Sequence, residues 1–389
     1  MRTWILSLLV LLSGCAHLGQ DAPPASRVAA LFNDAAFAPP SAPIDTDGLF
    51  ALSPEMRRHL NSTQFRALVR EHGQAHGLMH ALYDPRELQL DYDATRTGTA
   101  AETYAARKGN CLSLVIMTAA FARAMNMNVR FQEVPLEDTW SREHGLYLVS
   151  SHVNLSLAPN KPASVYDSSA AFTVDFVKLP PNASQRVRPL DEDGIVARYM
   201  NNRAAEELVQ GHADEAYWWA RAALLKKPSL TAAYNTLAVI YQRNGQPRLA
   251  EQVYRTALAF DPDSLIMLQN LVPVLSANGK ADEAAVLAQR IARLNPEPPY
   301  YYFDQGMTAY HAGDYVRART LFAREVARAP YNDEFHFWLG VANFQLGELH
   351  TAEQQLALAR DNSVRSDTRA RYSAKLAHLR DVAAGPRQN

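Results

Sequence analysis

Apolar side chains in the second half of the chain recur with a helical period that glycine and proline interrupt at fixed intervals. Five glycines stand 34 residues apart, an alanine follows each by five residues, and a proline follows each of the first four by 17. Such glycines allow a positive-φ turn between two helices, the alanines allow close helix approach, and the prolines end the second helix. The pattern predicts five stacked helical hairpins. The positions are Gly211, Gly245, Gly279, Gly313 and Gly347; Ala216, Ala250, Ala284, Ala318 and Ala352; and Pro228, Pro262, Pro296 and Pro330.

The helical array is expected to occupy residues 197–389. Pro273 lies within the first helix of the third hairpin and predicts a kink there. Val364 stands where the next proline is due, so the repeats should stop there, and a stripe of apolar residues then predicts a capping helix. The stripe is Tyr372, Leu376, Leu379 and Val382. The 34-residue pattern resembles tetratricopeptide repeats, a resemblance that implies a protein or peptide partner bound in the concave groove of the array.

Residues 51–180 change from helical to strand-like periodicity. Helical stretches are expected at 53–82, 99–108 and 111–127, a short strand at 88–92, and further strands at 129–134, 146–157 and 172–177. Helices followed by antiparallel strands indicate an α+β domain. The stretch 181–196 has a proline-rich, polar beginning and is interpreted as the linker to the repeats.

The N-terminus has the pattern of a processing signal. Arg2 precedes an apolar run over residues 4–12 that is too short to span a bilayer, so residues 1–14 are predicted to be a signal peptide. The run ends in Leu-Ser-Gly-Cys, which resembles a bacterial lipobox and implies lipidation of Cys15. By resemblance to sorted lipoproteins, Ala16 favours the outer membrane, facing the periplasm. Residues 15–50, rich in Ala and Pro, are interpreted as a spacer carrying the lipid.

Charge and cysteine content narrow the possible functions. Lys and Arg total 39 against 40 Asp and Glu, so no basic excess points to nucleic acid. The chain has two cysteines, and lipidation would use the first. Cys111 would then be an unpaired thiol in an oxidising compartment, where such thiols are uncommon unless they are buried or functional.

Cys111 is the candidate nucleophile. It opens a predicted helix directly after Gly109-Asn110, where backbone N–H groups and the helix dipole favour a thiolate. Strand alternation places His152 on the polar face of its strand, where it is the candidate base. Asp175 on the last strand and Asp167 in a preceding hairpin both qualify as the orienting acid; the cleaner alternation around Asp175 favours it. The Cys111 backbone N–H is the expected oxyanion donor, with Asn110 as a helper.

The residues 107–114, Arg-Lys-Gly-Asn-Cys-Leu-Ser-Leu, followed by His152 and an aspartate on successive strands, resemble a transglutaminase-like (papain-like cysteine) core over residues 100–176. The resemblance implies a Cys111 nucleophile, a His152 general base and Asp175 or Asp167 as orienter, with no cofactor and no metal. A metal site is the alternative for His72, His76 and His80, which recur every four residues. Glycines within that stretch and the lack of an HExxH motif favour a solvated or interface role instead.

Together these features predict a membrane-anchored cysteine enzyme that acts on amide or peptide bonds by hydrolysis or transfer, with the repeats recruiting its protein substrate or a partner. The alternative is a catalytically inactive lipoprotein whose repeats act as an assembly scaffold.

Overall fold

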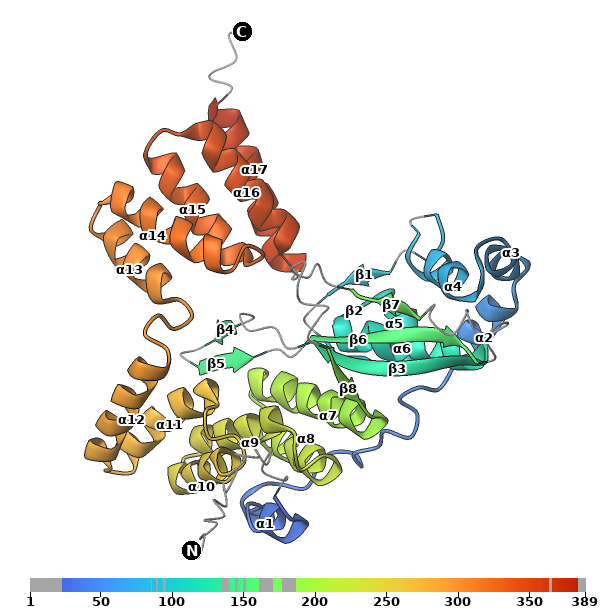
Figure 1. Ribbon diagram of the computed structural model, residues 1–389, viewed down its shortest axis with the longest axis horizontal. Helices are drawn as coiled ribbons and strands as arrows, with labels where there is room; N and C mark the ends of the chain where they lie inside the picture. Colours follow the sequence, from blue (N-terminus) through green and yellow to red (C-terminus); the bar gives the residue numbers. More distant parts are fainter. Residues whose placement is uncertain are drawn as a thin grey trace, which may run out of the picture.

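The computed structural model describes residues 23–84, 86–88, 90–93, 96–134, 140–143, 146–149, 152–160, 171–176, 187–363 and 366–383. An α+β unit leads into a curved array of paired helices (Figure 1). Within these ranges, no helix combines the length and apolar character needed to cross a membrane. The predicted signal peptide, Cys15 and Asp167 lie outside the described residues.

The helical stretch expected at 53–82 is divided into three helices: α2 (Pro54–Asn61), α3 (Thr63–His72) and α4 (Gln74–Tyr83). Ser62 separates the first two, and its hydroxyl accepts a 3.1 Å hydrogen bond from the Phe65 backbone N–H, which caps α3. Gly73 separates the second pair with a φ of 79°, a backbone conformation that glycine adopts at little cost.

The α+β unit is built on a four-stranded antiparallel sheet of order β7-β6-β3-β8. The strands are β3 (Met127–Val134), β6 (His152–Pro159), β7 (Phe172–Val174) and β8 (Arg188–Leu190). Helix α6 (Cys111–Ala124), which follows α5 (Ala100–Ala106), packs on β3 and β6. Strand β8 falls in the stretch interpreted from the sequence as a linker. The sequence does not predict this strand, because a three-residue edge strand that contains proline has the composition of a loop.

Two small strand pairs accompany this sheet. Strands β1 (Asp91–Tyr92) and β2 (Lys108–Gly109) pair in parallel just before α6. Strands β4 (Trp140–Glu143) and β5 (Leu146–Val149) form a hairpin that reaches toward the array, where β5 contacts the helix at residues 265–277 (Figure 1).

The repeat pattern of the sequence is confirmed in the second half of the chain. The five helix pairs are α7 (Glu192–Val209) with α8 (Ala213–Lys226), α9 (Thr231–Arg243) with α10 (Pro247–Leu258), α11 (Leu265–Ala277) with α12 (Ala281–Leu294), α13 (Tyr301–His311) with α14 (Tyr315–Arg328), and α15 (Asp333–Gln345) with α16 (Leu349–Asn362). All five ladder glycines lie between the helices of a pair, with φ of 68° to 88°. Helix α11 continues through Pro273, and α17 (Ser366–Ala383) packs on α16 through Leu376 and Leu379.

The hydrophobic core of the array is divided after the third repeat. One core joins the α+β unit to α7–α12, whereas a separate core begins at Tyr300 and serves α13–α15. The junction, residues 295–300, contains three prolines, and Tyr300 has a φ of 68°. Proline cannot continue a helix and stiffens the chain. Figure 1 shows the two groups of helices as distinct lobes that this segment joins.

Part of the segment interpreted as a spacer packs on the first two repeats. It contains α1 (Ala25–Ala29) and the 3-10 turn η1 (Asp34–Ala36). The Phe37 ring stacks on Tyr217 with a centroid distance of 4.0 Å, and the Tyr241 hydroxyl donates to the Leu31 carbonyl at 2.7 Å. The Trp218 indole N–H donates to the Ala38 carbonyl at 2.6 Å. Residues 31–38 are therefore a strap fixed across α8 and α9.

Candidate active site

Cys111 is the first residue of α6, and its thiol is nearly buried, with 9 % of the residue exposed. The side-chain oxygen of Asn110 caps the helix by accepting 2.9 Å hydrogen bonds from the Ser113 backbone N–H and hydroxyl. The Asn110 amide nitrogen donates to the Thr97 hydroxyl at 2.7 Å. Because the oxygen of this side chain caps α6 and its nitrogen donates to Thr97, the structure gives Asn110 the role of an N-cap, and neither group is left over for the expected role of oxyanion helper.

His152 and Asp175 lie side by side at one end of the sheet. The His152 Nε2 is 2.6 Å from the Asp175 Oδ1, and the Asn154 amide donates to the other carboxylate oxygen at 3.0 Å. Leu155 pairs with Val174, so Asp175 follows β7 at the level of Asn154. His152 is only 3 % exposed, and Asn154 is buried beside it. The polar face of β6 is thus covered by the fold, which strand alternation alone does not indicate.

The Cys111 side chain is a second neighbour of the His152 imidazole, and its interaction with the ring raises the pKa of His152. Because Nε2 meets Asp175, the Nδ1 nitrogen is the one left for the thiol. Burial lowers the pKa of His152, but the hydrogen bond to Asp175 and the interaction with Cys111 outweigh burial and raise it to about 9. The imidazole is therefore protonated at neutral pH, as expected beside two acidic groups.

Tyr92 is a third neighbour of the thiol that no sequence pattern indicates. Strand pairing places Tyr92 beside Gly109, and the Asp93 backbone N–H donates to the Gly109 carbonyl at 3.0 Å. The Tyr92 hydroxyl lies beside Cys111 and interacts with its side chain and its backbone. Burial raises the pKa of Tyr92, so its hydroxyl remains a proton donor. A two-residue strand carries too little pattern to reveal this pairing in advance.

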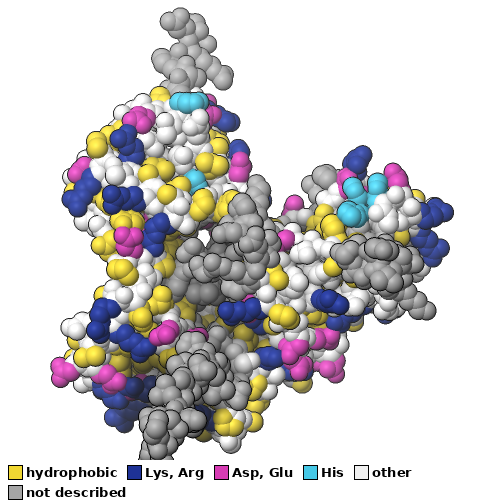
Figure 2. Space-filling model, viewed as in Figure 1, with side chains coloured by type: hydrophobic (Ala, Val, Ile, Leu, Met, Phe, Trp, Pro, Cys, Tyr) yellow, Lys and Arg dark blue, Asp and Glu magenta, His cyan; other side chains and the backbone are white. Residues whose placement is uncertain are grey.

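The three histidines considered for a metal do not share one helix face. Since Gly73 divides the helix, His72 and His80 stand on α3 and α4 with their rings stacked at 4.4 Å, and His76 lies 4.5 Å from the Phe172 ring. Figure 2 shows histidines gathered at this surface. Among the described residues, no group of three or more His, Cys, Asp or Glu side chains is arranged to hold a metal ion.

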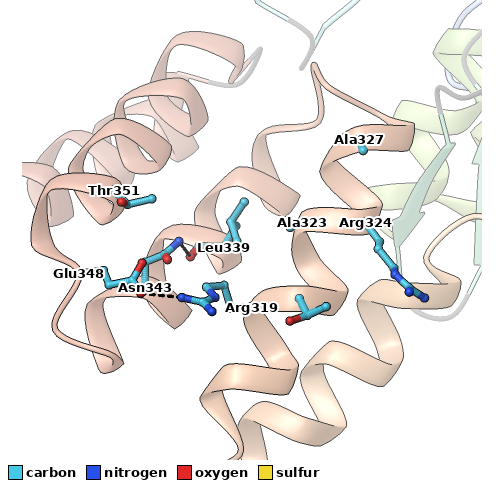
Figure 3. A pocket seen from close by; sticks show the side chains of 9 residues that line it. Arg319, Ala323, Arg324, Ala327, Leu339, Asn343, Glu348 and Thr351 are labelled. Carbon is cyan, nitrogen blue, oxygen red and sulfur yellow. Dashed lines mark hydrogen bonds and ion pairs between the residues drawn. The ribbon is translucent and has the colours of Figure 1, made fainter.

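The repeats offer a groove of about 570 Å³ in the last two hairpins (Figure 3). The second helices α14 and α16 contribute its sides, with Leu339 and Asn343 of α15 between them. Arg319 crosses from α14 to form a 2.6 Å ion pair with Glu348. Arg324 extends from α14 at the edge of the groove, where its guanidinium lies 5.3 Å from the centre of the Tyr302 ring. The groove therefore combines an apolar floor with arginine side chains, an arrangement suited to a peptide.

Comparisons with known proteins concern only the array. A family model described as tetratricopeptide repeat matches residues 270–333. A search of curated proteins finds no match.

Similar solved structures include PilF of Pseudomonas aeruginosa, with 21 % identity, coverage of 49 % of this chain and 94 % of that chain, and a TM-score of 0.28. A thermophilic TPR protein of Thermus thermophilus has 20 % identity, coverage of 46 % of this chain and 99 % of that chain, and a TM-score of 0.30. Another is YrrB, described as a TPR protein with an unusual peptide-binding site, with 20 % identity, coverage of 46 % of this chain and 92 % of that chain, and a TM-score of 0.25. These TM-scores are low, and no statement about this chain rests on them. The family match and the glycine ladder identify the C-terminal half as an array of tetratricopeptide repeats.

Proposed function

We propose that this protein is a transglutaminase-like cysteine enzyme that acts on amide or peptide bonds, and that its repeats recruit the protein substrate or a partner. The observation that carries the proposal is the convergence of Cys111, at the N-terminus of a buried helix, with His152, which is hydrogen-bonded to Asp175. A nucleophile, a base and an orienting acid in this order are what covalent catalysis by a thiol requires. Further support comes from the resemblance of residues 100–176 to that family.

The reaction proceeds in two balanced steps. The Cys111 thiolate attacks the amide carbonyl carbon, a C–S bond forms, and the C–N bond breaks as protonated His152 gives its proton to the leaving amine. Water or a primary amine then attacks the thioester, His152 takes up the proton released, and the Cys111 thiolate leaves. We expect the Cys111 backbone N–H to stabilise the negative charge that forms on the carbonyl oxygen, with the neighbouring Tyr92 hydroxyl as a second donor.

The proposal extends to location and recruitment. Lipid on Cys15 would anchor the chain to the outer membrane, facing the periplasm, and the strap over residues 31–38 would hold the first repeats near that anchor. A peptide segment of the substrate or partner would occupy the groove of the last two repeats.

Labelling of Cys111 tests the enzymatic function. A soluble chain that starts at Ala16 has Cys111 as its single thiol, so iodoacetamide uptake reports on that residue alone. Near pH 6.5, where an ordinary thiol is mostly protonated, we expect the chain to react roughly tenfold faster than a small-molecule thiol. His152→Ala should lower the rate about 10- to 100-fold, because the thiolate loses its imidazolium partner. The rates are followed by intact-mass spectrometry.

His212→Ala is the matched control, since His212 lies on the surface of the array and contacts Glu207. If Cys111 reacts no faster than the small thiol and His152→Ala changes nothing, the enzyme proposal is wrong. The scaffold function then remains, and it predicts that Cys111→Ala cells behave as wild type while deletion of residues 197–389 gives the null phenotype.

Tyr92→Phe tests the hydroxyl beside the thiol. Loss of the hydroxyl beside the charged sulfur should lower the alkylation rate near neutral pH by about tenfold while leaving the melting temperature nearly unchanged. Tyr83→Phe is the matched control, because the Tyr83 hydroxyl bonds to Thr118 at 3.0 Å, further along α6. Equal rates for the two variants would show that the Tyr92 hydroxyl does not act on Cys111.

A further inference from the structure

A buried set of hydrogen bonds connects the first helix of the repeats to the helix that carries Cys111. Its centre is Thr97, which is fully buried. The Thr97 hydroxyl accepts hydrogen bonds from the amide nitrogens of Asn110, at 2.7 Å, and Asn202 of α7, at 3.2 Å. The Thr97 backbone N–H donates to the Glu206 carboxylate, also on α7, at 2.6 Å. Helix α7 therefore holds Thr97 both by its side chain and by its backbone.

The same set continues into the cap of α6. The Gly98 backbone N–H donates to the Ser113 hydroxyl at 2.9 Å, and Ser113 in turn donates to Asn110. The packing here is tight: a Cβ at Gly109 would lie 2.7 Å from the Ser113 Cβ, and a Cβ at Gly98 would lie 2.9 Å from the Thr103 hydroxyl oxygen. A displacement of Thr97 would therefore be passed to Asn110 instead of being absorbed by empty space.

The energetics favour a specific role for the α7 residues. A buried backbone N–H without an acceptor is costly, so Glu206 fixes the position of Thr97 as well as contacting it. Burial raises the pKa of Glu206, against the opposing effect of the hydrogen bond from Thr97. A partly buried carboxylate at this place is unfavourable for a helix that merely stacks on its neighbour. The hydrogen bond from Thr97 and the ion pair with Arg203, at 3.7 Å, offset that cost.

We propose that Asn202 and Glu206 are positioning residues for Cys111. Through Thr97 and the Asn110 cap they hold the N-terminus of α6, and with it the Cys111 thiol and backbone N–H, against His152. Helix α7, the first helix of the repeats, thus helps to position the residues of the active site. This inference rests on the proposed function, since it concerns the same thiol.

Paired substitutions at Glu206 test the role of its oxygen acceptor. Glu206→Met keeps the length of the side chain but removes the acceptor for the Thr97 N–H, whereas Glu206→Gln keeps a carbonyl oxygen at that place. In the chain that starts at Ala16, iodoacetamide labelling of Cys111 is followed from about pH 5 to 10. We expect the Met variant to show a midpoint about one pH unit higher and a roughly tenfold lower rate near neutral pH. The Gln variant should restore most of the wild-type rate.

Glu207→Gln is the matched control, because the side chain of this neighbour on α7 bonds to Arg203 and His212 instead of Thr97. A Glu206→Met chain that melts cooperatively yet titrates like wild type would overturn the inference and leave the proposed function intact. A wild-type thiol of ordinary reactivity would overturn both. If Glu206→Met fails to fold, Asn202→Ala provides the test, since it removes only one of the two donors to the Thr97 hydroxyl. The inference requires the same upward shift in the pH midpoint of Cys111 labelling for this variant.

Discussion

Asp175→Asn should lower the reactivity of Cys111 by about 10²- to 10⁴-fold, with the fold retained. Asp175 accepts a hydrogen bond from His152 and holds the ring so that the other nitrogen meets the thiol. An asparagine amide offers a donor or a neutral acceptor at that position, so the imidazolium loses its charge partner and the thiolate becomes less favoured. Iodoacetamide labelling as a function of pH measures the effect.

The same substitution changes the dependence of stability on pH. The pKa of His152 is raised in the folded chain from an ordinary 6.5 to about 9. Its contribution to stability is therefore complete below about pH 6.5 and is lost as pH rises toward 9. Without the Asp175 hydrogen bond this loss should occur at lower pH, which thermal melts between about pH 6 and 9 would record.

Asp193→Asn serves as the control, because Asp193 makes an exposed ion pair with Lys226 far from the thiol. An Asp175→Asn chain that labels and melts like Asp193→Asn would contradict the role given to Asp175.

A chain that ends at residue 191, just before α7, should fail to fold, whereas a chain that ends at residue 294 should fold and retain a reactive Cys111. Ile195, Tyr199 and Met200 of α7 are buried in the core that also contains α6 and the sheet. Each contributes about 1.5–3 kcal/mol, and their joint loss is comparable with the whole stability of a typical domain, about 5–15 kcal/mol. Far-ultraviolet circular dichroism and thermal melts of the two chains provide the measurement.

The end point at 294 is the matched comparison, because α12 is already largely exposed and of its residues only Ala284 is buried. Removal of the last lobe therefore uncovers little apolar surface. Cooperative melting of the chain that ends at residue 191 would show that the α+β unit folds without the repeats.

The repeats could be predicted almost completely from the sequence because their information is local and repeated. The positive φ of Gly245, for example, depends only on the turn that contains it, and the four other ladder glycines lie in the same kind of turn. The division of the hydrophobic core after the third repeat was not predictable. The 34-residue spacing of the prolines includes Pro296, and the two further prolines of the junction fall between the repeated positions.

The candidate site was predictable only where strand and helix patterns carry it. Cys111 at a helix start and the alternation around Asp175 can be read along the chain, and the structure brings both to His152. Tyr92 and Glu206 had no such signal. Tyr92 depends on a two-residue parallel pairing, and Glu206 meets Thr97 across more than a hundred residues of sequence. Contacts of this kind depend on tertiary packing alone.

The proline-rich junction at 295–300 has a consequence for how such a protein can change over time. Because the lobe from Tyr301 onward has its own core, substitutions that alter what it recognises leave the surroundings of Cys111 untouched. Recognition and chemistry can then diverge at separate rates. An altered groove around Arg319 and Asn343 would redirect the protein to another partner, and whole lobes taken from other repeat proteins could be joined at this junction to choose its target.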